Sequence, residues 1–189
     1  MRFRRLLLVL LALFFSGVPS AAAEGDWALL GQPRAIVLFR HATAPGTGDP
    51  AGFALGDCAT QRNLNEQGRT QARAIGEGFR TRGVVVGRVL SSQWCRAVET
   101  AQLAFPGRVE QAPAFNSFFA NAAARPKTTA RALDTLARWT GPGVLVVVTH
   151  QVNITALTGI APSDGAGVIV RMQDAVPTVI GRLPPPVVD

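Results

Sequence analysis

Hydrophobic residues follow two patterns along the chain: nearly unbroken short runs, and longer stretches in which they recur about every 3.6 residues. An unbroken run indicates a strand that is buried on both faces, as in a parallel sheet covered by helices. Such runs predict strands at 34–39, 84–91 and 144–149, and two final strands at 167–172 and 178–183.

The 3.6-residue period predicts helices between these strands. The clearest covers 64–82, where Asn65 is available as an N-cap and Gly83 follows as a stop. Three further helices are predicted: one that Ser91 or Ser92 would cap, one over 128–139, and a short one before Gly159.

Strands and helices alternate along most of the chain, without an internal repeat or a long linker. The interval 106–128 is less regular and predicts a short strand followed by a loop-like insertion. Alternation of this kind predicts an α/β protein, a three-layer α/β/α sandwich around a mostly parallel central sheet. We expect one domain, residues 24–189.

The first 23 residues have the layout of a secretory signal peptide. Three arginines precede an apolar stretch, Leu6–Phe15, and an Ala-x-Ala pattern ends at Ala23. We expect cleavage after Ala23 and a secreted or periplasmic protein. The alternative is a retained membrane anchor, but the apolar stretch is about half of the roughly 20 residues that a spanning helix needs.

Charge and composition narrow the class of partner. Removing the three signal arginines from the formal net charge of +7 leaves +4, and no run of Lys or Arg remains. A nucleic-acid partner is therefore not expected. No spacing of His, Cys or acidic residues is typical of a zinc site, so neither a metal nor another cofactor is expected. The sequence does not indicate an oligomeric state.

Both histidines of the chain directly follow predicted strands, His41 after the first and His150 after 144–149. Ligands of open parallel sheets bind beyond the carboxyl ends of the strands, so these side chains should meet at one rim. Arg40 and Arg96 belong to the same rim and offer planar donors for phosphate oxygens. Taken singly, each residue could be structural, but together they predict a phosphoryl-transfer site with a neutral imidazole as nucleophile.

Four segments carry a resemblance to a known family. They are FRHA at 39–42, RNLNEQGRTQARAIG at 62–76, SSQWCRAVETA at 91–101 and VVTHQVN at 147–153. In this order they resemble the signature segments of the histidine phosphatase superfamily, in its phosphoglycerate mutase-like branch. The resemblance extends from residue 36 to about 155 and implies a phosphoglycerate mutase-like fold.

The resemblance implies a role for each matching residue. His41 matches the histidine that becomes phosphorylated, and His150 matches the second histidine of the core. Arg40 and Arg96 match phosphate-binding arginines, and Arg62 resembles an additional one found in the small phosphohistidine-phosphatase-like members. Two neighbours of the histidines are further candidates for substrate binding, Thr43 and Gln151.

The general acid that protonates the leaving group is not identified. The mutase-like branch usually supplies a glutamate after the third signature, but 112–126 contains no carboxylate, and Gln151 replaces the aspartate of the acid phosphatase branch. Weak candidates remain, Glu110, Asp49 and Asp57. Lack of an acid would slow alkoxide leaving groups by roughly 10²–10⁴-fold and affect aryl leaving groups less.

The two cysteines lie close in sequence to matched arginines, Cys58 four residues before Arg62 and Cys95 directly before Arg96. If both arginines hold one phosphate, the two sulfurs come near each other, and an exported chain meets an oxidising environment. A disulfide is therefore predicted, with two buried thiols as the alternative.

The combined prediction is an exported phosphomonoesterase that works through a phosphohistidine on His41. Its partner would be a small phosphorylated substrate, with a phosphosugar of the cell envelope as one candidate. Two alternatives remain open: a non-catalytic module that binds phosphate or a phosphosugar on the same fold, and a phosphotransferase of the phosphoglycerate mutase type.

Overall fold

The computed structural model describes residues 25–188, so the predicted signal peptide, 1–23, lies outside the described residues. No helix in this described part of the chain is long and apolar enough to cross a membrane. The strands are β1 (Ile36–Arg40), β2 (Val86–Ser91), β3 (Val109–Gln111), β4 (Val144–Thr149), β5 (Gly167–Gln173) and β6 (Val176–Leu183). The α-helices are α2 (Glu66–Thr81), α3 (Cys95–Ala104), α4 (Arg125–Ala137) and α5 (Gln151–Thr158). Short 3₁₀ turns are η1 (Trp27–Gly31), η2 (Cys58–Thr60), η3 (Pro113–Phe115) and η4 (Ala122–Ala124).

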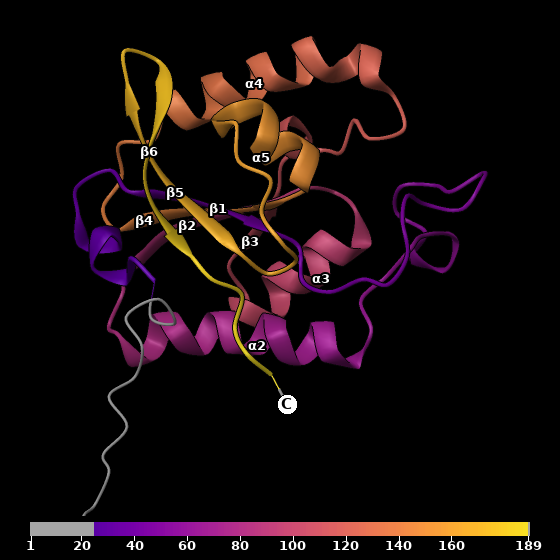
Figure 1. Cartoon of the computed structure of the whole chain (residues 1–189), viewed down its shortest axis with the longest axis horizontal. Coiled ribbons are helices and arrows are strands. Elements are labelled where there is room, and N and C mark those ends of the chain that lie inside the picture. Colours follow the sequence, from indigo (N-terminus) through magenta and orange to yellow (C-terminus); the bar gives the residue numbers. More distant parts are fainter. Residues whose placement is uncertain (1–24, 189) are drawn as a thin grey trace, which may run out of the picture.

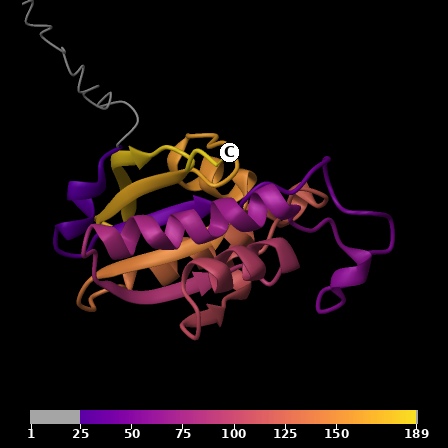
Figure 2. The ribbon, with the colours of Figure 1, turned by 90° about the horizontal axis from the view of Figure 1, so that it is seen from below.

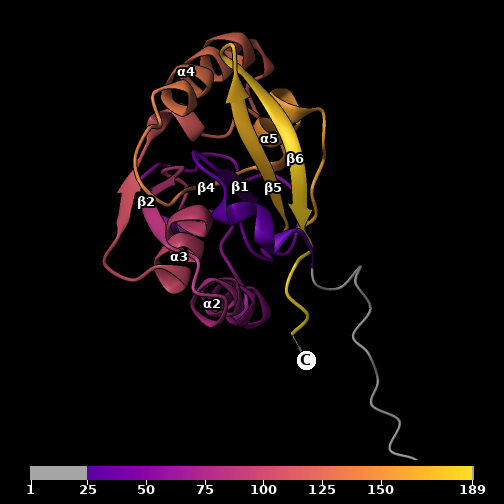
Figure 3. The same ribbon diagram turned by 90° about the vertical axis from the view of Figure 1, so that its left-hand side faces the viewer.

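The strands form one mixed sheet in the order β3-β2-β4-β1-β5-β6 (Figure 1). The first four in this order are parallel, whereas β5 runs antiparallel to β1, and β6 antiparallel to β5. Helices α2 and α3 cover one face, and α4 and α5 cover the other (Figure 3). This arrangement confirms the predicted α/β fold with a mostly parallel sheet.

The core explains why β1 and β4 are apolar without alternation. Side chains on one face of the sheet, such as Phe39, pack with Phe79 of α2 and Ala97 of α3. Those on the other face, such as Leu38, pack with Leu136 of α4 and Ile154 of α5. Because helices exclude water from both faces, each fully buried large side chain contributes about 1.5–3 kcal/mol.

Helix α2 has the predicted cap, Asn65, and begins at Glu66, two residues after the start of the predicted range. The Asn65 side chain accepts a hydrogen bond from the Gly68 amide at 2.8 Å and caps the first turn. Gly68 also lets the helix touch the chain just after His41, since a Cβ there would lie 2.1 Å from the Thr43 carbonyl oxygen. From this end of β1, helix α2 runs along the sheet to the opposite end of the strands (Figure 2).

Two helix starts differ from the prediction. Helix α3 begins at Cys95 with Trp94 as N-cap, so neither Ser91 nor Ser92 is the cap residue. The Ser92 hydroxyl accepts from the Trp94 amide at 3.3 Å and lies 2.8 Å from His150 Nε2. Helix α4 begins at Arg125 rather than at 128, with a proline in its first turn, where the missing N–H costs nothing. Part of the predicted insertion is therefore helical.

Candidate active site

A cavity of about 480 Å³ lies at the rim where the parallel strands β1 and β4 end, and α3, which follows β2, contributes Arg96 to its lining. Both histidines of the chain line this cavity. Its polar wall contains the predicted residues Arg40, His41, Arg62, Arg96, His150 and Gln151, together with Arg125, which the sequence did not indicate. The sequence pattern placed Arg125 in a loop, and only the fold brings the start of α4 to this rim.

The two imidazoles are buried and lie edge to face, with ring centroids 5.4 Å apart. His41 Nδ1 is 2.8 Å from the Ala42 carbonyl oxygen, which can only accept, so Nδ1 carries the hydrogen. Nε2 of His41 therefore keeps its lone pair and accepts from Arg96 Nε at 3.3 Å. This tautomer leaves Nε2 as the nucleophilic atom.

Both histidines are neutral at pH 7. Burial lowers the pKa of His41 from 6.5 to about 3, and the positive charges of Arg96, Arg62 and Arg40 act in the same direction, against the hydrogen bond to Ala42. Burial also holds the pKa of His150 well below 6.5, with His41 and the arginines adding to the effect. The imidazole that must attack is thus present as the free base.

Burial of neutral His41 predicts a loss of stability in acid. Between pH 6.5 and about 3, His41 binds a proton in the unfolded chain but not in the folded protein. The contribution of neutral His41 to the free energy of unfolding is therefore complete above pH 6.5 and falls as the pH falls below it. The slope is about 1.4 kcal/mol per pH unit. Urea unfolding of the wild type and of His41→Asn at pH 7.0, 5.5 and 4.5 measures it. We expect a steeper decline for the wild type, and parallel declines would contradict the assignment.

Two of the arginines are neutralised by carboxylates that the fold brings to them. Arg96 makes a two-pronged ion pair with Asp49, at 2.6 and 3.1 Å, and both side chains are less than 10% exposed. Arg40 Nε lies 2.7 Å from Asp164 Oδ1. Burial raises the pKa of Asp164 in spite of the nearby arginines. No sequence pattern had indicated Asp164, which lies in the loop between α5 and β5.

Arg62 and Arg125 have no acidic partner within 4 Å among residues 25–188. Arg62 donates to backbone carbonyls instead, to Gly48 at 2.8 Å and to Ala44. Arg125 is exposed at the start of α4. These uncompensated charges favour an anion in the cavity, and two arginine forks suit a phosphoryl dianion.

None of the described residues that line the cavity is Asp or Glu. Glu110 is exposed and pairs with Arg88, and Asp57 is exposed and accepts from the Ala59 amide. Asp49 is ionised, because Arg96 and other donors hold its pKa below the usual value in spite of burial. The structure therefore gives none of the three candidates the position and protonation state of a general acid.

Thr43 and Gln151 have different positions. Gln151 begins α5 and lines the cavity. Thr43 is not among the lining residues, because its amide and hydroxyl both donate to Gln71 Oε1 of α2, at 3.0 and 3.2 Å. The predicted contact of Thr43 with substrate has no support in this geometry. Among the described residues, no group of three His, Cys, Asp or Glu is placed to hold a metal ion.

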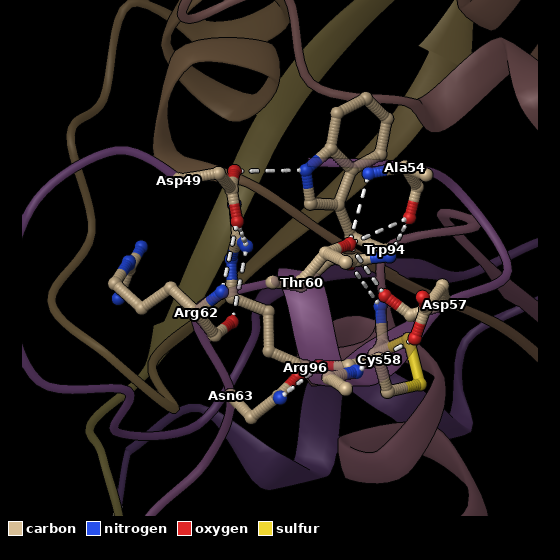
Figure 4. The surroundings of a disulfide bond; sticks show 12 residues. Asp49, Ala54, Asp57, Cys58, Thr60, Arg62, Asn63, Trp94 and Arg96 are labelled. Atoms are coloured by element: carbon tan, nitrogen blue, oxygen red, sulfur yellow. Dashed lines mark hydrogen bonds and ion pairs between the residues drawn. A yellow bond between two sulfur atoms is a disulfide. The ribbon is translucent and has the colours of Figure 1, made fainter. Parts of the chain in front are cut away.

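Cys58 and Cys95 are joined by a disulfide, with Cα atoms 5.6 Å apart (Figure 4). The bond links the end of the long loop after β1 to the first residue of α3, directly before Arg96. The Cys95 amide donates to Gln61 Oε1 at 3.0 Å, so the segment that carries Arg62 is held at the same point. The disulfide thus ties together the two chain segments that carry Arg62 and Arg96.

Several solved structures share this fold. The protein histidine phosphatase SixA complexed with tungstate is 18% identical, with 80% of this chain and 97% of that chain covered and a TM-score of 0.57. A phosphoserine phosphatase from Entamoeba histolytica in complex with 3-phosphoglyceric acid is 13% identical (79% and 96% covered, TM-score 0.58). The alpha-ribazole phosphatase from Shigella flexneri is 17% identical (77% and 94% covered, TM-score 0.52).

No curated protein matches the chain in sequence. A family model does match, that of the histidine phosphatase superfamily (branch 1), over residues 36–117. The matched segment contains His41 and the arginines at 40, 62 and 96, which the fold places around one cavity. The resemblance to the histidine phosphatase superfamily, predicted from the sequence segments, is therefore confirmed by the family model over residues 36–117.

Proposed function

We propose that this chain is an exported phosphatase that hydrolyses phosphate monoesters through a phosphohistidine on His41. The observation that carries the proposal is the state of His41: a buried, neutral imidazole whose Nδ1 is held by the Ala42 carbonyl and whose Nε2 lies beside Arg96 at the cavity. Members of the superfamily are phosphatases or mutases. The SixA structure holds tungstate, a tetrahedral oxyanion like phosphate.

The reaction consists of two in-line displacements. In the first, the Nε2 lone pair of His41 attacks phosphorus, a P–N bond forms, and the P–O bond to the leaving group breaks. Arg62 and Arg96 stabilise the charge on the equatorial oxygens. In the second, water attacks phosphorus, the P–N bond breaks, and inorganic phosphate and neutral His41 are released. His150 lies beside this path, with its Nε2 hydrogen-bonded to Ser92.

The leaving group must depart without help from a carboxylic acid on the cavity wall, since the described lining contains none. Esters whose leaving group is itself acidic, such as aryl phosphates, therefore suit the site better than alkyl phosphates. Phe118 and Phe119 give the cavity an apolar side that fits an aromatic ring or the face of a sugar, and Phe119 is 57% exposed. A phosphosugar of the cell envelope remains a candidate on this basis.

Export rests on the pattern of residues 1–23 and gains support from the disulfide, because such bonds persist in oxidising compartments. Expression of the whole sequence in a Gram-negative bacterium tests location and activity together. We expect a periplasmic protein whose mass corresponds to a start at Glu24, and turnover of p-nitrophenyl phosphate. Isomerisation of a phosphoglycerate without net hydrolysis would favour the mutase, and binding of phosphate without turnover would favour the non-catalytic module.

A further inference from the structure

Asp49 accepts hydrogen bonds from Arg62, Trp94 and Arg96 (Figure 4), and two of these residues, Arg62 and Arg96, line the cavity. Its Oδ1 accepts from Arg96 Nη1 at 2.6 Å and from the Arg62 amide at 3.2 Å. Its Oδ2 accepts from Arg96 Nη2 at 3.1 Å and from Trp94 Nε1 at 3.0 Å. Four donors thus converge on one buried carboxylate. Three of them belong to Arg62 and Arg96, and the fourth belongs to Trp94, two residues before Arg96.

The two edges of the Arg96 guanidinium have separate partners. The outer edge, Nη1 and Nη2, is bound to Asp49, while Nε lies 3.3 Å from Nε2 of His41. A planar fork held by two parallel bonds cannot rotate about its long axis. The Nε edge of Arg96 therefore keeps a constant orientation toward the attacking nitrogen.

The loop that carries Asp49 is itself well anchored. Gly48, its neighbour, accepts a hydrogen bond from Arg62 Nε at 2.8 Å, and the Phe53 ring packs on Trp94 with centroids 5.6 Å apart. The Cys58–Cys95 disulfide closes the far end of the same loop. Asp49 is thus held from both sides while it holds Arg96.

We propose that Asp49 is a positioning residue, which fixes the Arg96 guanidinium in the orientation that stabilises phosphoryl transfer to and from His41. This inference rests on the proposed function. A direct role in proton transfer is the competing explanation, since Asp49 is a carboxylate in direct contact with Arg96, which lines the cavity. The geometry opposes it, because both oxygens are occupied by donors and Asp49 is not among the residues that line the cavity.

The test compares Asp49→Asn with the wild type on two substrates, p-nitrophenyl phosphate and an alkyl phosphate such as glycerol 2-phosphate. Asparagine keeps the shape but loses the charged two-pronged pair. We expect kcat to fall about 10–100-fold on both substrates, with KM within about 3-fold, because misplacing an oriented group by about 1 Å costs rate of this order. A loss confined to the alkyl phosphate would identify a general acid and overturn the proposal.

A double-mutant cycle tests whether Asp49 acts through Arg96. Arg96→Lys keeps the charge but cannot form the two-pronged pair. In that background Asp49→Asn should change kcat less than about 3-fold, since the interaction is already lost. An undiminished effect would show that Asp49 acts by another route. The matched control is Asp134→Asn, which removes an exposed Asp–Arg pair on α4 and should leave kcat unchanged.

Two controls show whether a negative result concerns the folding of the variant, the proposed phosphatase activity, or the role of Asp49. Thermal melts show whether Asp49→Asn is folded. If it is not, Asp49→Glu keeps the charge, moves the carboxylate by one methylene, and should lower kcat on both substrates alike. A wild type that hydrolyses neither ester contradicts the phosphatase itself. A wild type that is active, beside an Asp49→Asn variant of equal kcat, contradicts only the role of Asp49.

Discussion

Turnover of phosphate esters is expected to fall at least about 10³-fold when His41 is replaced by asparagine, because the attacking lone pair is removed. Asparagine retains a similar size and a neutral side chain in the buried site, so the fold should persist. Release of p-nitrophenol by the purified wild type and variant measures the loss. Circular dichroism of both proteins serves as the folding control.

The same step predicts a trapped intermediate. Phosphohistidine is labile in acid and stable in base, so alkaline quenching during turnover should preserve one phosphoryl group on the wild type and none on His41→Asn. Peptide mass spectrometry should locate this group on the peptide that contains His41. Phosphate on a serine, or no covalent phosphate in a burst experiment, would contradict the two-displacement scheme.

Replacing Arg96 with alanine should lower kcat/KM roughly 30- to 1000-fold. This factor corresponds to a loss of about 2–4 kcal/mol of transition-state stabilisation. Arg96 provides a charged donor beside His41 Nε2, in a site with little exposure to water. Initial rates on p-nitrophenyl phosphate give the change. Arg88→Ala is the control, because Arg88 is an exposed arginine that pairs with Glu110 and does not line the cavity.

Stability must be measured alongside activity for this variant. Alanine at position 96 leaves Asp49 buried without its main partner, and breaking a buried ion pair in this way typically costs 3–5 kcal/mol of stability, as an order of magnitude. The rates are therefore compared at a temperature where melting curves show both proteins to be folded. An unchanged kcat/KM in folded Arg96→Ala would remove Arg96 from the site.

The pattern of residues along the chain was enough to predict which segments are buried and where a local hydrogen bond caps a helix. Strands β1 and β4 are apolar on both faces, so their burial could be recognised without knowing the neighbours. The cap of α2 by Asn65 involves a residue only three positions away. His41 and His150 could be brought to one rim because each directly follows such a strand, and the carboxyl ends of parallel strands share an edge.

Partners far apart in sequence were decided only by the tertiary structure. Asp49 and Arg96 are 47 positions apart, and no local pattern distinguishes this aspartate from Asp57, which caps a surface turn. Arg125 lines the cavity only because the start of α4 lies at this rim. Thr43 likewise bonds to Gln71 only because α2 packs against the chain after His41. The physical reason is that a backbone pattern reflects burial and local hydrogen bonds. Ion pairing and the pKa of His41 depend instead on which side chains the whole fold brings within a few ångströms, and on how much water it excludes.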